Sequence, residues 1–127
     1  MPYKITNGKY ESLFASGEYK KIYKPGSVIE VYDTLGFMLF ERKIDALAFR
    51  AFTYRILYMD TYIKPIRILT VMGIGKQTIP ELISSSCHYN KLSLFYINKD
   101  FVTQHEPPNG TVCYHKIRIL WDDERDD

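Results

Sequence analysis

Short runs of β-branched and aromatic residues, separated by turn residues, dominate the first forty positions of the chain. Asn7-Gly8 predicts a hairpin, because this dipeptide suits a type I′ turn between two strands. Pro25-Gly26 predicts a tight turn between two further extended segments. The extended segments expected in this part of the chain are the hairpin 3–15, the basic segment 19–24, the run 28–31 and a buried strand at 35–41.

The period of the pattern changes from strand to helix near residue 44. Apolar residues recur at helical spacing at Ile44, Leu47, Ala48, Ala51 and Phe52. An acid in the first turn, Asp45, suits the positive end of a helix. The bases Arg42, Lys43, Arg50 and Arg55 lie off this apolar stripe. We therefore expect a helix from about residue 44 to about residue 54.

The second half of the chain returns to strands. Residues 66–72 are rich in β-branched positions, and Pro80 is expected to begin a short helical turn through Ile83. Segments 91–97 and 111–120 are predicted to pair as an antiparallel hairpin. The element order predicts an α+β fold, a mainly antiparallel β-sheet with one main helix packed against it. We expect a single domain over residues 1–121 and an acidic tail over residues 122–127.

Both cysteines stand next to a histidine or one residue away from it, in Cys87-His88-Tyr89 and Cys113-Tyr114-His115. Cys and His are common zinc ligands, so Cys113 and His115 on one strand face are the candidate metal ligands. In the predicted hairpin, Cys113 lies opposite a residue near Phe95, and Cys87 is about eight residues further along, roughly 26 Å away. Neither a disulfide nor a shared zinc spans that distance. The pattern therefore favours two structural thiols, and we expect no metal and no cofactor.

Composition and charge narrow the class of protein. Hydrophobic content of 46% and charged content of 25% are typical of a globular protein. The absence of a signal peptide, of a membrane-spanning run and of a disulfide framework predicts a cytoplasmic location and no membrane partner. The last six residues hold five acids and one base, a charge of −4; since the whole chain carries +2, the remaining residues carry +6.

Eleven tyrosines in 127 residues indicate contact surfaces, because a tyrosine ring packs while its hydroxyl stays hydrated. The residues predicted to bind a ligand or partner are Tyr19, Lys21, Tyr23, Arg50, Tyr54, Arg55, Tyr114 and His115. Tyrosine interleaved with lysine, as in residues 19–24, also suits a nucleic-acid surface, which would continue over 42–43, 50–55 and residue 67. Tyrosine-rich edge strands also favour a homo-oligomer.

A catalytic alternative needs residues that the sequence does not place together. A small nucleotide-transfer-like enzyme would need a pocket that gathers His115, Tyr114 and a carboxylate such as Glu30 or Glu41. Residues 73–78 superficially resemble a phosphate-binding loop, but its first glycine is too close to the Gly-Lys pair. No nucleophile elbow or Cys/His protease signature is present.

Two segments of the chain resemble a class of small uncharacterised proteins found in phage and environmental genomes. The first runs from Tyr23-Lys24-Pro25-Gly26 through Thr34-Leu35-Gly36 to the expected helix, and the second is Asn109-Gly110-Thr111-Val112-Cys113-Tyr114-His115 with the strand that follows. The resemblance covers about half of the chain. It implies a mobile-element origin and a role as a small accessory protein, and it transfers no catalytic residue. The function expected from the sequence is therefore the binding of a host protein or a small ligand.

Overall fold

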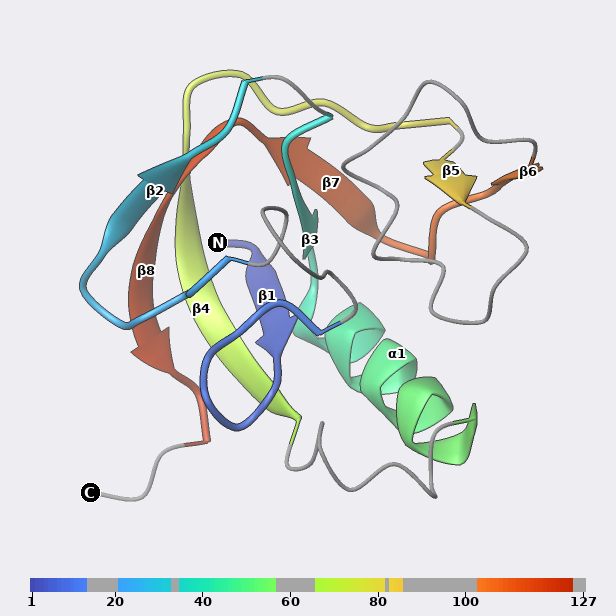
Figure 1. Cartoon of the computed structure of the whole chain (residues 1–127), viewed down its shortest axis with the longest axis horizontal. Helices are drawn as coiled ribbons and strands as arrows, with labels where there is room; N and C mark the ends of the chain where they lie inside the picture. Colours follow the sequence, from blue (N-terminus) through green and yellow to red (C-terminus); the bar gives the residue numbers. More distant parts are fainter. Residues whose placement is uncertain (14–20, 33–34, 57–65, 82, 86–102, 125–127) are drawn as a thin grey trace.

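The computed structural model describes residues 1–13, 21–32, 35–56, 66–81, 83–85 and 103–124. In these ranges the chain forms a six-stranded antiparallel sheet in the order β2-β8-β4-β1-β3-β7, a separate two-stranded sheet of β5 and β6, and helix α1 (Figure 1). The predicted α+β fold class is confirmed. The elements are β1 (Tyr3–Thr6), β2 (Val28–Glu30), β3 (Phe37–Phe40), α1 (Lys43–Ile56), β4 (Arg67–Ile74), β5 (Ile83–Ser85), β6 (Thr103–His105), β7 (Thr111–Tyr114) and β8 (Lys116–Asp122).

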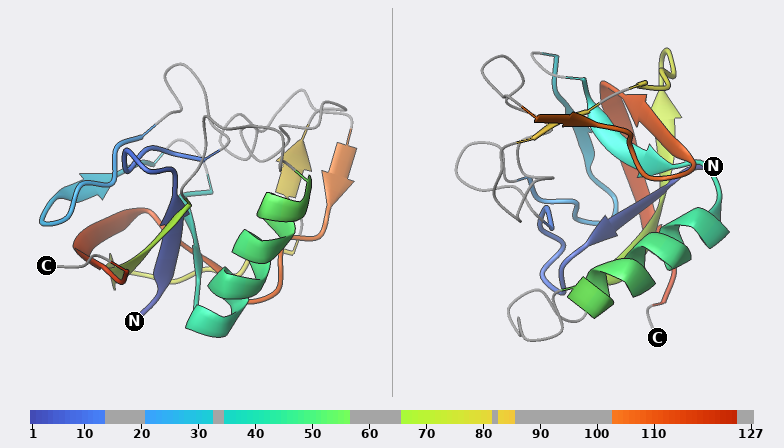
Figure 2. Two further views of the ribbon diagram at one scale, coloured as in Figure 1. Left: turned by 90° about the horizontal axis from the view of Figure 1, so that it is seen from below. Right: turned by 90° about the vertical axis from the view of Figure 1, so that its right-hand side faces the viewer.

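The sheet is strongly curved, and one core lies inside the curve (Figure 2). Strand β7 ends the strand order and β8 is the second strand from the other end, yet they contribute Val112, Ile117 and Ile119 to that same core. The segment that precedes β2 lies over the open side, where Tyr23 is fully buried and meets Phe37 edge to face. Pairing between neighbouring strands satisfies their backbone groups and leaves the apolar side chains to fill the interior of the curve.

Helix α1 packs against the other face of the sheet (Figure 2). A second core there joins Ala46 to Ile5, Phe40, Ile66 and Ile68, with Phe49 and Tyr54 at its margin. The helix therefore rests on Ala46, Phe49 and Thr53. The apolar stripe from which we predicted the helix points away from the sheet: Ile44, Leu47, Ala48, Ala51 and Phe52 are all exposed.

Several local predictions are confirmed. The turn at Pro25-Gly26 closes with a hydrogen bond from Ser27 N to Lys24 O, and Gly26 has a φ of 92°. Strand β3 lies within the buried run expected at 35–41, and all four of its residues are buried. The helix and strands β2 and β4 also stand where the pattern placed them, with ends shifted by a few residues.

The predicted N-terminal hairpin is wrong. Strand β1 pairs with β4 along its whole length and with β3 at Tyr3, whereas Glu11 forms a bridge with Ile22. The Asn7 side chain explains the change, because its Oδ1 accepts hydrogen bonds from the backbone N–H groups of Lys9 and Glu11. These bonds make a side-chain-capped loop that leads the chain away from β1.

Two predictions in the second half of the chain are also wrong. The expected strand 111–120 is two strands, β7 and β8, that separate at His115 and pair with different neighbours. Cys113 has Met38 on one side and Thr78 on the other, so no edge is left for the hairpin partner expected near Phe95. Residues 91–97 lie outside the described residues. Pro80 leads into strand β5 instead of the helical turn that we expected.

Candidate functional site

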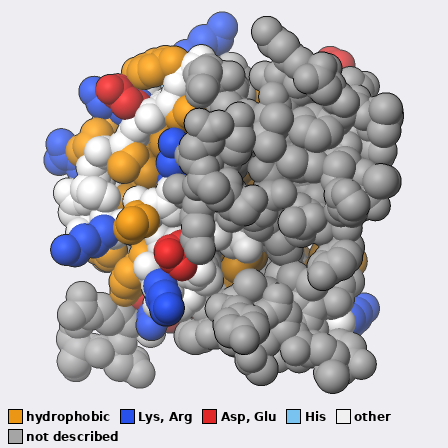
Figure 3. Space-filling model, viewed as in Figure 1, with side chains coloured by type: hydrophobic (Ala, Val, Ile, Leu, Met, Phe, Trp, Pro, Cys, Tyr) orange, Lys and Arg blue, Asp and Glu red, His pale blue; other side chains and the backbone are white. Residues whose placement is uncertain are grey.

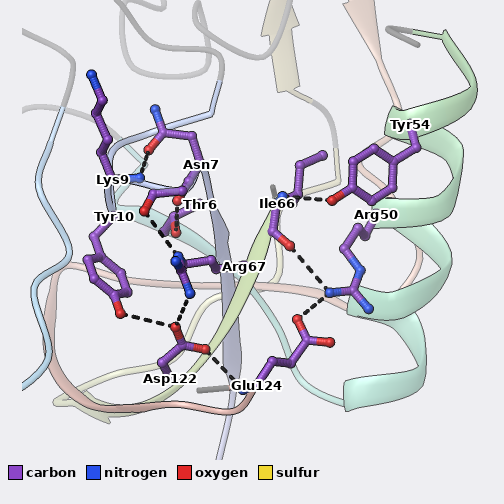
Figure 4. Close-up of polar contacts among 11 residues, drawn as sticks. Thr6, Asn7, Lys9, Tyr10, Arg50, Tyr54, Ile66, Arg67, Asp122 and Glu124 are labelled. Atoms are coloured by element: carbon purple, nitrogen blue, oxygen red, sulfur yellow. Dashed lines mark hydrogen bonds and ion pairs between the residues drawn. The ribbon is translucent and has the colours of Figure 1, made fainter. Parts of the chain in front are cut away.

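The residues predicted to bind a partner do not form one surface. Tyr23 is in the core, and Tyr19 lies outside the described residues. Arg50 and Tyr54 join α1 to the start of β4: Arg50 Nη1 donates to the Ile66 carbonyl at 3.3 Å, and the Ile66 N–H donates to Tyr54 Oη at 2.7 Å (Figure 4). These contacts position the helix on the sheet, so both side chains have a structural role in this fold.

Two further residues predicted to bind a partner are Lys21, which precedes β2, and Arg55, which lies on α1. The Lys21 backbone exchanges hydrogen bonds with Ser12, which ties residues 21–24 to the chain after β1. Arg55 lies exposed in the last turn of α1, far along the helix from the basic residues at its start. Of these two residues, Arg55 is the one whose side chain is exposed for contact with a partner.

The C-terminal acids form ion pairs with three bases of the predicted nucleic-acid surface. Asp122 belongs to β8 and is buried, and the acids that follow it reach back to α1 and β4 (Figure 4). The ion pairs are Lys43–Asp123 at 3.0 Å, Arg67–Asp122 at 2.9 Å and Arg50–Glu124. The hydrogen bond from Lys43 to Asp123, reinforced by the charge of that carboxylate, raises the pKa of Lys43. Bases held in internal pairs have less charge to offer to phosphates.

His115 lies at the corner between β7 and β8, beside β2. Its Nδ1 is 2.8 Å from the Val31 carbonyl oxygen, and its ring stacks on Tyr32 with centroids 5.6 Å apart. The Tyr32 hydroxyl donates to a Glu30 carboxylate oxygen at 3.1 Å, and this bond raises the pKa of Tyr32. The structure thus links the half-buried His115 to the exposed Glu30 through Tyr32. Basic and hydrophobic side chains are interspersed on the side of the molecule that carries β2 and β8 (Figure 3).

Tyr114 points to the other side of the same corner. Its ring packs on Gly73, and its hydroxyl donates to Gln77 Oε1 at 2.8 Å. Glu41 lies just before α1, on a different part of the molecule. His115, Tyr114 and Glu41 therefore do not share a pocket, and the constellation that a nucleotide-transfer-like site would need is not assembled from them.

The interior of the curved sheet holds a small polar cluster. The Lys4 ammonium donates to the Met38 carbonyl at 3.0 Å and lies 4.9 Å from the centre of the Tyr23 ring. Among the described residues, Tyr23 Oη is the buried side-chain oxygen without a hydrogen-bond partner. Burial raises the pKa of Cys113 to about 12, so its thiol is protonated at neutral pH. In the described ranges no group of three His, Cys, Asp or Glu residues could hold a metal ion.

The outer side of α1 is the clearest candidate for contact with a partner. We call it the α1 outer face, and its residues are Ile44, Leu47, Ala48, Ala51 and Phe52. Ile44 is 66% exposed and Phe52 is 53% exposed, although both side chains are large and apolar. Single exposed apolar residues are ordinary on protein surfaces, but a contiguous row on one helix face is a frequent mark of an interaction site.

The position of this surface was not readable from the helical period alone. The helix is apolar on both sides, because Ala46 and Phe49 stand between the residues of the stripe that we had recognised. A helix with apolar residues on two opposite sides can pack against two neighbours. The second apolar row, Ala46 and Phe49, is the sequence signal that could have shown that only one of two apolar sides of the helix packs on the sheet.

Within the described residues, no helix is long and apolar enough to cross a membrane. The chain matches no protein-family model, no curated protein and no solved structure, so the candidate site is defined by its own geometry.

Proposed function

We propose that this chain is a small accessory protein that acts by binding another protein chain through the α1 outer face. The observation that carries the proposal is the exposure of Ile44 and Phe52 on a helix whose opposite side is packed on the sheet. Burying one such side chain against a partner contributes about 1.5–3 kcal/mol. The resemblance to small phage and environmental proteins supports an accessory role and makes a host protein a suitable partner.

The shape of the surface favours a protein partner over a small molecule. Small-molecule sites are concave and enclose their ligand, whereas the outer side of a helix is convex. Helices recognised by proteins present anchors at positions i, i+3, i+4 and i+7. Ile44, Leu47, Ala48 and Ala51 have this spacing. The partner is therefore expected to offer an apolar groove or a second helix.

Hydrogen bonds and ion pairs hold α1 to the neighbouring parts of the fold. Arg50 and Tyr54 hold the last turns of α1 to Ile66, and the acid pairs of Lys43 and Arg50 hold it to the end of β8. A preorganised helix face loses little conformational entropy when a partner binds. In this proposal the half-buried side chains of Arg50 and Tyr54 position the surface, and the direct partner contact predicted for them stays a prediction.

Site-specific photo-cross-linking in cells that express the full chain tests the proposal. A photoreactive amino acid replaces Ala48 in one version and Ile79 in a control version; Ile79 is 69% exposed and is not on α1. We expect adducts at position 48 that disappear when Phe52→Glu is added, with the fold retained. Equal labelling at positions 48 and 79, or adducts that persist in the Phe52→Glu protein, would count against the proposal.

A further inference from the structure

The α1 outer face has a symmetric arrangement about Ala48. Ile44 and Phe52 stand four residues on either side of it, and Glu41 and Arg55 stand seven residues on either side. At about 100° of rotation per residue, Ile44 and Phe52 lie about 40° from the line through Ala48 and Arg55 lies about 20° from it. Arg55 therefore belongs to this row, and the expectation that it lies off the apolar stripe is wrong. All four helical side chains are exposed, and so is Glu41, which lies two residues before α1 begins.

The charges at the two ends of this row are opposite. Glu41 lies at the N-terminal end of the row and Arg55 at the C-terminal end, and neither makes an ion pair with another described residue. The other charged groups near the row are engaged on its flank, where Arg42 pairs with Asp45 and Lys43 pairs with Asp123. An incoming surface therefore meets one acid, an apolar centre and one base, in that order.

We propose that the partner on the α1 outer face is a second copy of this chain, packed with its α1 antiparallel and with the two-fold axis at Ala48. In this dimer Ala48 meets the partner's Ala48, Ile44 meets the partner's Phe52, and Glu41 meets the partner's Arg55. The same surface is used on both sides, as a two-fold interface requires. The inference rests on the proposed function, because it names the partner of the same surface.

Size complementarity supports this arrangement. Small side chains at Ala48 and Ala51 let two helices approach closely at the centre, while Ile44 and Phe52 fill the space on either side. The row at positions 44, 48 and 52 follows the i, i+4 ridge of the helix, which is a standard packing surface. A different protein can bind this face without such symmetry, whereas a two-fold dimer of this chain requires the face to be complementary to itself.

The charges select the antiparallel orientation. Two parallel helices in register would place Glu41 beside Glu41 and Arg55 beside Arg55, and like charges disfavour such a pair. In the antiparallel dimer, Glu41 of each chain lies beside Arg55 of the other chain, which gives one acid–base pair at each end of the interface. Exposed pairs of this kind contribute little affinity, so they are expected to set the orientation while the apolar centre provides the binding energy.

Sedimentation equilibrium of the purified full chain tests the inference. We expect a species of twice the 15.0 kDa chain mass that dissociates on dilution. Ala48→Glu places two carboxylates at the axis and should weaken the dimer about 100-fold or more, because two desolvated like charges cost several kcal/mol. Ile79→Glu is the matched control and should leave the dimer unchanged. Circular dichroism confirms that each variant is folded.

A charge exchange tests the orientation. Glu41→Arg and Arg55→Glu should each weaken the dimer by about three- to tenfold, and the double variant should return to within about threefold of the original affinity. A monomer at all concentrations, a dimer insensitive to Ala48→Glu, or a double variant without recovery would each overturn the inference. If the purified chain is monomeric but position 48 still cross-links another protein in cells, this inference fails and the proposed function stands.

Discussion

The Arg67 guanidinium lies 2.9 Å from the Asp122 carboxylate, and the two side chains differ sharply in exposure: 31% for Arg67 and 0% for Asp122. The carboxylate also accepts hydrogen bonds from the Tyr10 hydroxyl and the Glu124 N–H (Figure 4). One buried acid thus joins β4, β8 and the loop after β1, at the end of the curved sheet.

Replacing Asp122 should destabilise the fold. Asp122→Ala removes the acceptor from three donors, but Arg67 can regain water on its exposed side, so we expect a loss of about 2–3 kcal/mol. The free energy of unfolding in urea measures the effect. Arg42→Ala, which removes a pair whose base is 72% exposed, is the control and should cost less than about 0.5 kcal/mol. Equal losses in the two variants would contradict the structural role of Asp122.

Two glycines with similar φ angles should respond differently to alanine. Gly36 has a φ of 100°, and an added Cβ would lie 2.6 Å from the Tyr114 carbonyl oxygen. Gly26 has a φ of 92° and nothing within 4 Å of an added Cβ. Gly26→Ala should cost about 1–2 kcal/mol from backbone strain alone, and Gly36→Ala about 3 kcal/mol or more. Thermal unfolding of both variants compares them, and similar melting temperatures would refute the close approach of β7 to Gly36.

The orientation of α1 can be tested with one substitution at two positions. Ala46 is fully buried against the sheet, whereas Ala48 is on the α1 outer face. Ala46→Leu should destabilise the monomer by about 1–3 kcal/mol through overpacking, and Ala48→Leu should change it by less than about 0.5 kcal/mol. Urea unfolding at low protein concentration separates this effect from self-association. A larger loss at position 48 would mean that the helix packs on its other side.

Cys113 should be chemically inert in the folded protein. Its pKa of about 12 leaves about one thiol in ten thousand ionised at pH 8, whereas an exposed cysteine is ionised to roughly a quarter. In a Cys87→Ser background, a thiol reagent at pH 8 should react at least about 1,000-fold faster in urea than in buffer. Rapid labelling of the folded protein would contradict the burial of Cys113.

The same thiol predicts the response to alkali. The pKa is raised from 9.0 to about 12 on folding, so the folded state holds the proton more tightly than the unfolded state. The stabilisation from this group is complete below pH 9 and is lost as the pH rises through 12. Unfolding measured across this window should show a loss that Cys113→Ala removes. A Cys113→Ala protein with the same pH dependence would assign the loss to another group.

Local signals explain which elements were predictable. The turn at Pro25-Gly26 depends on a fixed proline φ and a positive glycine φ, both of which are properties of single residues. The prediction of strand β3 depends on an apolar run of a few residues, and that of helix α1 depends on an apolar repeat over a few helical turns. These features were therefore readable without knowledge of the partners that each element contacts.

Pairing and orientation were decided by the tertiary structure. Strand β1 leaves its expected hairpin because β4 and β3 bury Ile5 and because Asn7 caps the loop that follows. The chain turns at His115, since β7 and β8 must each complete a different part of the curved sheet.

The sequence by itself determined the α+β class, the helix and most strand positions, because backbone preferences and apolar periods act over short distances. The tertiary structure alone decided which strands pair and which of two apolar helix faces is buried. Ala46 and Phe49 face the sheet while Ile44 and Phe52 face solvent, although both rows are apolar. That choice depends on the shape of the neighbouring surface, and this shape exists only after distant strands have paired.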